Sequence, residues 1–443
     1  MLKRLNSNDT IENAQVKIKD ADIGNLYETG LEFNAPARGK WNIVHTGLLI
    51  PESHQVFVCA QGCLRGVIQT TAEMNAMDRM SWVTLGENDM FDGSMESDIV
   101  DGTAQILNRM DKLPRAVLVF ISCMHLFAGC DFKYAIKELS RIFPTVDFID
   151  CYMHPTMRKS GLTPDQAMLK QLYAPLKPTE TKRKAVNMIG NERPTSESSE
   201  LYSLIKSAGY DVCDITLFKS YDEYLRMAES ELNICYLPVA LASVNALKIR
   251  VGIDYCYAPL CYGYDEIESG YRKIADMLGA EAPDYSDCKR KADDALKSAF
   301  NVIGDNPIEI DYTATPRPLG LARLLIEHGF TVGKVYIDCI SDEEKADFEW
   351  LRSNAPDLIL SATVQVKMRF VNHAEHGTEP LAIGQKAAYF SGTKHFVNVV
   401  SGGGNYGFDG IVKLAESMVD AFTNEKDTQT VIQYKGIGCE SCL

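Results

Sequence analysis

Three cysteines occupy two short segments whose composition suits iron-sulfur chemistry. Cys59 and Cys63 are separated by three residues in VFVCAQGCLRG, and Cys123 directly follows the apolar run AVLVFIS. If that run is a strand of a parallel sheet, Cys123 lies at its carboxyl end, where open α/β sheets bind their ligands. Thiolates from separate segments commonly converge on iron-sulfur clusters. The three residues are therefore candidate cluster ligands, and the alternative is that they are buried cysteines that serve only as small apolar side chains.

The remaining cysteines leave a zinc site open as a rival interpretation. The chain has 13 cysteines and no secretory signal, so a disulfide framework is not expected in a reducing cytosol. Zinc sites usually combine two compact pairs of ligands. Cys439 and Cys442 form one such pair, and no second pair stands nearby. We therefore leave these two residues out of the predicted site.

Histidines near the cysteine segments are candidate proton donors at neutral pH. They are His54, His125 and His154, and His154 is the candidate catalytic residue. The alternative for each is a structural histidine with satisfied hydrogen bonds.

A glycine-rich segment from Gly402 to Gly407 has the pattern G-x-G-x-x-G ahead of a predicted helix. Such a loop can hold a phosphate at a helix N-terminus. A nicotinamide site also needs a further strand with an acidic end, and too little chain follows for one. The sequence also lacks a G-x-x-x-x-G-K-[ST] loop, so any ATP hydrolysis is expected from a partner.

Alternating strand and helix patterns predict the elements that would position these residues. From Lys184 the chain repeats short apolar strands and amphipathic helices, as in Rossmann-like domains with parallel sheets. At roughly 150 residues per domain, 443 residues suggest three domains. We predict an α/β fold of three Rossmann-like domains with parallel sheets flanked by helices: residues 1–183 with the cluster cysteines, 184–282 with Cys235, and 283–443 with the glycine loop. In the first, the stretch that contains Cys59 and Cys63 and precedes AVLVFIS looks less regular.

Composition restricts the partners and the compartment. A formal net charge of -15 argues against binding nucleic acid or an anionic membrane, which both require a basic surface. No run of about 18 apolar residues and no signal peptide is evident. We expect a cytoplasmic protein that acts on small molecules and binds other proteins.

Four segments in the same order resemble the α-subunit of the nitrogenase component 1 family. They are SHQVFVC, FISCMHLFAGCDF, ELNICYLPVALASVNALKIRVGIDYCYAPL and VNVVSGGGNYGFDGIVKLAESM, and the resemblance spans roughly residues 40 to 422. It implies that Cys59 and Cys123 bind a P-cluster-like iron-sulfur cluster and that Cys235 binds an active-site metallocluster. It also implies that Gly402, Gly403 and Gly404 form a wall of the cofactor region.

Two departures from the family pattern change what the resemblance implies. The family's first P-cluster cysteine has no counterpart between Leu31 and Pro51. Cys63 can replace it, which suggests a four-iron cluster (4Fe-4S) bound by Cys59, Cys63, Cys123 and a ligand from a partner subunit. The family's cofactor histidine falls near Val397, and the nearest histidine is His395, which argues against dinitrogen as the substrate.

The resemblance thus predicts an oxidoreductase, one subunit of a nitrogenase-like reductase. It would pair with a homologous component 1 subunit, in a heterotetramer, and accept electrons from an ATP-hydrolysing iron-sulfur reductase. It would reduce a small substrate at a bound metallocluster. The alternatives are a scaffold for metallocluster assembly, marked by a solvent-accessible Cys235 and no turnover, a tetrapyrrole-reducing relative, and a metal-free α/β binding protein.

Overall fold

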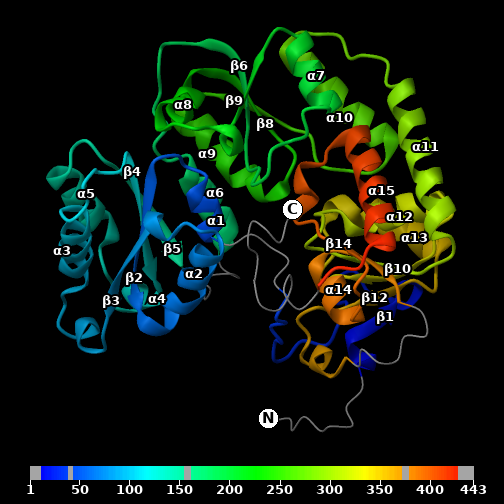
Figure 1. The fold of residues 1–443 in the computed structure, drawn as a ribbon, viewed down its shortest axis with the longest axis horizontal. Helices are drawn as coiled ribbons and strands as arrows, with labels where there is room; N and C mark the ends of the chain where they lie inside the picture. The colour runs from blue at the N-terminus through cyan, green and yellow to red at the C-terminus, as the bar shows by residue number, and fades with distance from the viewer. Residues whose placement is uncertain (1–10, 38–42, 154–160, 372–378, 428–443) are drawn as a thin grey trace. The chain divides into compact units, whose positions relative to one another are not determined.

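The computed structural model describes residues 11–37, 43–153, 161–371 and 379–427 (Figure 1). The chain divides into two compact units. We call Trp41–Pro194 with Ile205–Pro259 the cysteine unit. We call Met1–Lys40, Thr195–Leu204 and Leu260–Leu443 the glycine-loop unit.

The cysteine unit begins with a four-stranded parallel sheet in the order β3-β2-β4-β5. Its strands are β2 (Ser53–Ala60), β3 (Met80–Leu85), β4 (Ala116–Ser122) and β5 (Asp147–Met153). Alternate side chains of β2 and β4 enter two separate apolar cores, one on each face. One face carries α3 (Met95–Leu107) and α5 (Phe132–Ile142), and the other carries α1 (Ile43–Leu48), α2 (Gln61–Glu73) and α6 (Pro164–Leu172) (Figure 1).

A second four-stranded parallel sheet in this unit has the order β7-β6-β8-β9. Its strands are β6 (Arg183–Met188), β7 (Asp211–Asp214), β8 (Ser230–Cys235) and β9 (Asp254–Tyr257). The connections contain α7 (Glu200–Ser207), α8 (Tyr221–Leu225) and α9 (Leu241–Val251).

The glycine-loop unit contains a six-stranded sheet in the order β1-β12-β11-β10-β13-β14. Five strands are parallel: β10 (Ile308–Asp311), β11 (Val332–Tyr336), β12 (Ile359–Ser361), β13 (Leu381–Ile383) and β14 (Phe396–Val397). The sixth, β1 (Gln15–Lys17), pairs antiparallel with β12. The helices are α10 (Tyr264–Leu278), α11 (Ser286–Ile303), α12 (Pro318–Glu327), α13 (Lys345–Asn354), α14 (Gln385–Ser391) and α15 (Gly407–Thr423).

The predicted α/β class, with parallel sheets flanked by helices, is confirmed. The expectation of a less regular stretch around Cys59 and Cys63, before AVLVFIS, was wrong, because β2, α2, β3 and α3 follow one another there. The three domain boundaries stay a prediction, although β1 joins the sheet of the C-terminal part of the chain. Over the described residues, no helix has both the length and the apolar character needed to cross a membrane.

Candidate metal centre

The candidate ligands Cys59, Cys63 and Cys123 lie at the carboxyl edge of the first sheet, where its strand order reverses. β2 and β4 are neighbours, and the chain continues outward from them to β3 on one side and to β5 on the other. Val58 pairs with Ile121 on the neighbouring strand, so Cys59 lies one residue and Cys123 two residues beyond this pair. In open α/β sheets the crevice at such a reversal is where ligands bind.

The helices that follow these two strands leave toward opposite faces of the sheet. On α2, which carries Cys63, Leu64 packs into the core that contains Cys59. Cys123 begins α4 (Cys123–Phe127), and Met124 of that helix packs into the opposite core. The two segments therefore start at the same edge of the sheet and run to opposite faces. Cys59 and Cys123 lie at that shared edge.

Burial and a neighbouring thiol both affect the protonation of Cys59 and of Cys63. Burial raises the pKa of Cys59 to about 12, and the neighbouring Cys63 adds to this shift. Burial also raises the pKa of Cys63, with a further contribution from Cys123. Cys59 is buried, Cys123 is half-buried and Cys63 is exposed, so the group extends from the interior to the surface. A metal that binds these thiols must displace their protons, which makes binding stronger at higher pH.

The arrangement suits a multi-iron cluster better than a single metal ion. Among the described residues, no group of three or more His, Cys, Asp and Glu converges closely enough to hold one ion. In an iron-sulfur cluster each cysteine binds its own iron, so the sulfur atoms need not meet at a single point. Three thiols along one sheet edge, one of them exposed, fit such a cluster with a fourth ligand from elsewhere.

Cys235 has the corresponding position in the second sheet, but its surroundings are closed. It ends β8, next to β6, where the order β7-β6-β8-β9 reverses. Its side chain is 0% exposed and belongs to an apolar core with Tyr173 and Ile189. The role of Cys235 as a metallocluster ligand therefore stays a prediction from the resemblance.

Two of the three candidate histidines, His54 and His125, lie within the described residues, and both are buried. His54 lies in the first half of β2, contacts Ser81 Oγ through Nε2 at 2.9 Å, and is buried, which lowers its pKa to about 4. His125 is buried, and its Nδ1 accepts a hydrogen bond from the Ser122 amide at 3.3 Å. His395 Nδ1 lies 3.0 Å from the Ala421 carbonyl oxygen in α15. The catalytic candidate, His154, lies outside the described residues.

Backbone hydrogen bonds hold the glycine loop against the segment that follows β10. The Ser401 amide donates to Thr313 O at 2.8 Å, and the Gly402 amide donates to Ala314 O at 2.6 Å. Gly402 has a φ of 81°, and a Cβ on it would lie 2.7 Å from a methyl of Leu260. Glycine is therefore required at Gly402 by the fold itself.

A protein carboxylate occupies the helix N-terminus that the glycine pattern offers to a phosphate. Glu200 Oε1 accepts a hydrogen bond from the Asp409 amide in the first turn of α15, at 3.0 Å. Glu200 Oε2 accepts a second one from the Tyr271 hydroxyl, also at 3.0 Å. This carboxylate accepts a hydrogen bond from the helix N-terminus, where a bound phosphate would otherwise accept it. The role of Gly402, Gly403 and Gly404 in cofactor binding stays a prediction.

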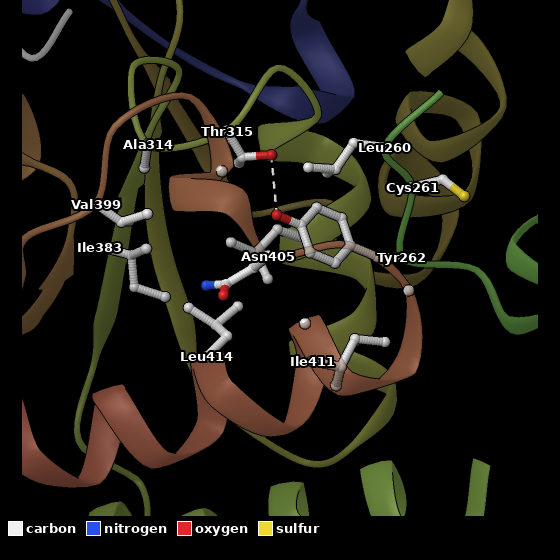
Figure 2. Close-up of a pocket in the computed structure, with 14 residues that line it drawn as sticks. Leu260, Cys261, Tyr262, Ala314, Thr315, Ile383, Val399, Asn405, Ile411 and Leu414 are labelled. Carbon is white, nitrogen blue, oxygen red and sulfur yellow. Dashed lines mark hydrogen bonds between the residues drawn. The ribbon is translucent and has the colours of Figure 1, made fainter. Parts of the chain in front are cut away.

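Asn405, within GGGNYG, was not among the predicted site residues. The side-chain amide of Asn405 faces a pocket beneath the loop (Figure 2). Within the sequence its only signal is that an amide side chain interrupts a run of glycines.

Comparison with solved structures identifies the fold. A chain of nitrogenase Cp1 at pH 6.5 matches with a TM-score of 0.68 and 14% identity, over 90% of this chain and 95% of that one. A chain of nitrogenase Cp1 at pH 5 matches with a TM-score of 0.58 and 12% identity, over 93% and 94% of the two chains. At these identities the similarity defines a fold class, the α/β fold of nitrogenase component 1.

A family model identifies the group to which the chain belongs. The model of nitrogenase component 1 type oxidoreductases matches residues 45–423. The protein is therefore a member of the nitrogenase component 1 type oxidoreductase family. No curated protein is similar enough in sequence to count as a match.

Proposed function

We propose that this chain is the cluster-binding subunit of a nitrogenase-like reductase. Cys59, Cys63 and Cys123 hold a four-iron cluster together with a ligand from a homologous partner subunit. An ATP-hydrolysing iron-sulfur reductase would supply the electrons, and a second metallocluster, if Cys235 holds one, would supply the site at which a small substrate is reduced. The observation that supports the proposal is the position of the three cysteines at the carboxyl edge of the first sheet, where its strand order reverses.

The surroundings of the cysteines suit electron transfer between two proteins. A bound iron-sulfur cluster supplies a one-electron carrier whose potential depends on solvent exposure and on hydrogen bonds to sulfur. Cys59 anchors the inner end of the group, where the apolar core excludes water. Cys63 is exposed at the surface, where a partner can contribute the fourth ligand. Leu126 and Phe127, which follow Cys123 on α4, are 44% and 68% exposed and add an apolar surface for that partner.

The burial of Cys235 favours a reductase over an assembly scaffold. A scaffold that delivers its metallocluster to another protein needs a thiol that solvent and the recipient can reach. Cys235 is 0% exposed. The proposal of a tetrapyrrole-reducing relative differs in substrate and shares the cysteine site, so the same test of electron transfer applies to both.

ATP-dependent reduction of the purified complex tests the proposed function. The chain is co-expressed with its partner subunit, purified without oxygen, and mixed with the reductase and either ATP or ADP. We expect a new electron paramagnetic resonance signal with ATP and none with ADP, and no signal in Cys123→Ala. Cys151→Ala is the matched control, because Cys151 is a buried cysteine on β5 of the same sheet, away from the reversal point. A complex that dithionite reduces but the reductase with ATP does not would contradict this proposal.

A further inference from the structure

β3 is an edge strand of the first sheet, and one of its two long sides is free. The order β3-β2-β4-β5 gives β3 a single strand neighbour, β2 (Figure 1). The apolar cores on the two faces of the sheet reach β3 through Met80 on one face and Leu85 on the other. Apart from the pairing with β2, the backbone of residues 81–84 forms no hydrogen bond with a described residue. Free backbone donors and acceptors along such an edge can pair with another strand.

β3 lacks the features by which proteins commonly protect an edge strand. Charged side chains, prolines and covering segments block the pairing of edges, but the sequence of β3, MSWVTL, has neither a charge nor a proline. Trp82 is 42% exposed, and Thr84 is exposed as well. The opposite edge strand, β5, contains Asp147 and Asp150, and the side-chain amide of Gln171 donates to Asp150 O at 2.6 Å. Of the two edges of this sheet, the edge at β3 is therefore the one open to pairing.

The segment that follows β3 is strongly acidic. Residues 81–108 include no lysine, arginine or histidine, and they include six carboxylates: Glu87, Asp89, Asp92, Glu96, Asp98 and Asp101. No ion pair joins any of these carboxylates to a described residue. Clustered charges of one sign attract a partner of the opposite sign and repel one of the same sign. The segment therefore favours a basic partner.

Close packing of α3 against β3 keeps these carboxylates near the free edge. A Cβ on Gly102 would lie 2.6 Å from Val83 Cγ2, so the helix contacts the strand at this point. Asp98 and Asp101 lie within about one helical turn of Gly102. The loop between β3 and α3 carries three more carboxylates and one strongly exposed aromatic ring: Glu87, Asp89, Asp92 and Phe91, which is 84% exposed. The open edge and the acidic segment thus belong to one surface.

We propose that the free edge of β3 binds an extended, lysine- or arginine-containing segment of a partner protein as an added strand. Backbone hydrogen bonds to β3 supply affinity, Trp82 packs against an apolar side chain of the added strand, and the carboxylates of residues 87–101 select a basic segment. A second copy of this chain fits less well, because its own β3 would bring the same carboxylates to the edge. The proposal goes beyond the reductase function and does not depend on the iron-sulfur cluster.

Binding of three synthetic peptides to the full-length chain tests the proposal. The probes are KKVTVTVKK, its acidic counterpart EEVTVTVEE, and KKVTPTVKK, which keeps the charge but has a proline in place of the central valine. Fluorescence anisotropy of the labelled peptides should show that KKVTVTVKK binds at least about tenfold more tightly than either of the others, because proline removes a backbone donor and prevents strand pairing. Binding of KKVTVTVKK should also weaken as the salt concentration rises.

Hydrogen exchange and one pair of variants locate the binding site on the chain. Bound KKVTVTVKK should slow the exchange of backbone amides within residues 81–84. Thr84→Lys should weaken binding at least about tenfold, because a lysine on the edge repels the basic peptide. Thr181→Lys, at an exposed position before β6 in the same unit, is the matched control and should bind as the native protein does. Circular dichroism checks that both variants are folded.

Three results would overturn the proposal. The first is equal affinity of the native chain for KKVTVTVKK and KKVTPTVKK, which would show attraction by charge without strand pairing. The second is binding that leaves the exchange of the β3 amides unchanged. The third is full binding in folded Thr84→Lys.

Discussion

At the scale of single residues, buried or half-buried carboxylates accept hydrogen bonds from helix N-termini in the glycine-loop unit. Glu200 does so for α15, and Asp311 Oδ2 accepts a hydrogen bond from the Ala387 amide of α14 at 2.8 Å. Glu344 Oε1 accepts one from the Leu319 amide of α12 at 2.7 Å. Each carboxylate reaches its helix from another part of the chain, as Glu200 does across 209 residues to Asp409. Sequence analysis could not predict these contacts, because local capping patterns involve residues only a few positions apart.

Glu344 should make the stability of the protein depend on pH. Burial raises its pKa from 4.5 to about 7, despite the hydrogen bond from the Leu319 amide and the charge of Arg317. Between these two pH values the folded protein keeps a proton that the unfolded chain has released, so the free energy of unfolding falls as pH rises. The contribution of Glu344 is present below pH 4.5 and is lost through pH 7, and it amounts to about 3 kcal/mol.

Replacing Glu344 should remove that dependence. In Glu344→Gln the side-chain carbonyl can still accept the Leu319 hydrogen bond, and no proton is exchanged. We expect the stability of the variant relative to the native protein to rise by about 3 kcal/mol between pH 4.5 and pH 8 in denaturant titrations. Glu349→Gln, at an exposed position on α13, the helix that directly follows Glu344, controls for the loss of one charge. Parallel pH profiles for the native protein and Glu344→Gln would show that this interpretation is wrong.

At the scale of elements, the glycine loop depends on a close approach at Gly407. This residue has a φ of 72°, and a Cβ on it would lie 1.8 Å from the Tyr271 hydroxyl oxygen. That hydroxyl is the one that donates to Glu200, so any side chain at 407 would break the capping of α15.

Gly407→Ala should therefore destabilise the protein by at least about 3 kcal/mol, from strained backbone, a steric clash and a lost buried hydrogen bond. Gly279→Ala is the matched control, because Gly279 also has a positive φ, 64°, and a Cβ there would meet nothing within 4 Å. The control should cost only about 1 kcal/mol. Chemical denaturation compares the two, and equal losses would contradict the proposed clash.

The elements missed by sequence analysis were missed for a physical reason. β2 starts with Ser53, His54 and Gln55, which look like loop residues but are all buried. The Ser53 hydroxyl donates to Ile50 O at 2.7 Å, and the Gln55 amide donates to Val44 O at 3.0 Å. Because of these hydrogen bonds, polar residues can form the first positions of an interior strand. Runs such as AVLVFIS, whose residues are apolar throughout, were predicted as strands and are strands, here β4.

At the scale of the whole molecule, the α/β class could be predicted from the sequence, but the strand order could not. The pairing of β1 with β12 joins residues more than 340 positions apart, as between Gln15 and Ser361. No periodic pattern encodes such a partner, and neither do the reversals at β2 and β4 or at β6 and β8. Motif spacing and family resemblance predicted Cys59, Cys63 and Cys123 as a group. Only the strand order explains why two segments separated by about sixty residues bring these thiols together.

The iron and acid-labile sulfide content of the anaerobically purified complex tests the central claim most directly. The native chain with its partner subunit should contain both elements and should show an iron-sulfur signal in electron paramagnetic resonance. Cys59→Ala, Cys63→Ala and Cys123→Ala should each lose the iron of this cluster, while Cys151→Ala should retain it. A native complex free of iron, or the same iron content in all four variants, would contradict the assignment of these three cysteines as cluster ligands.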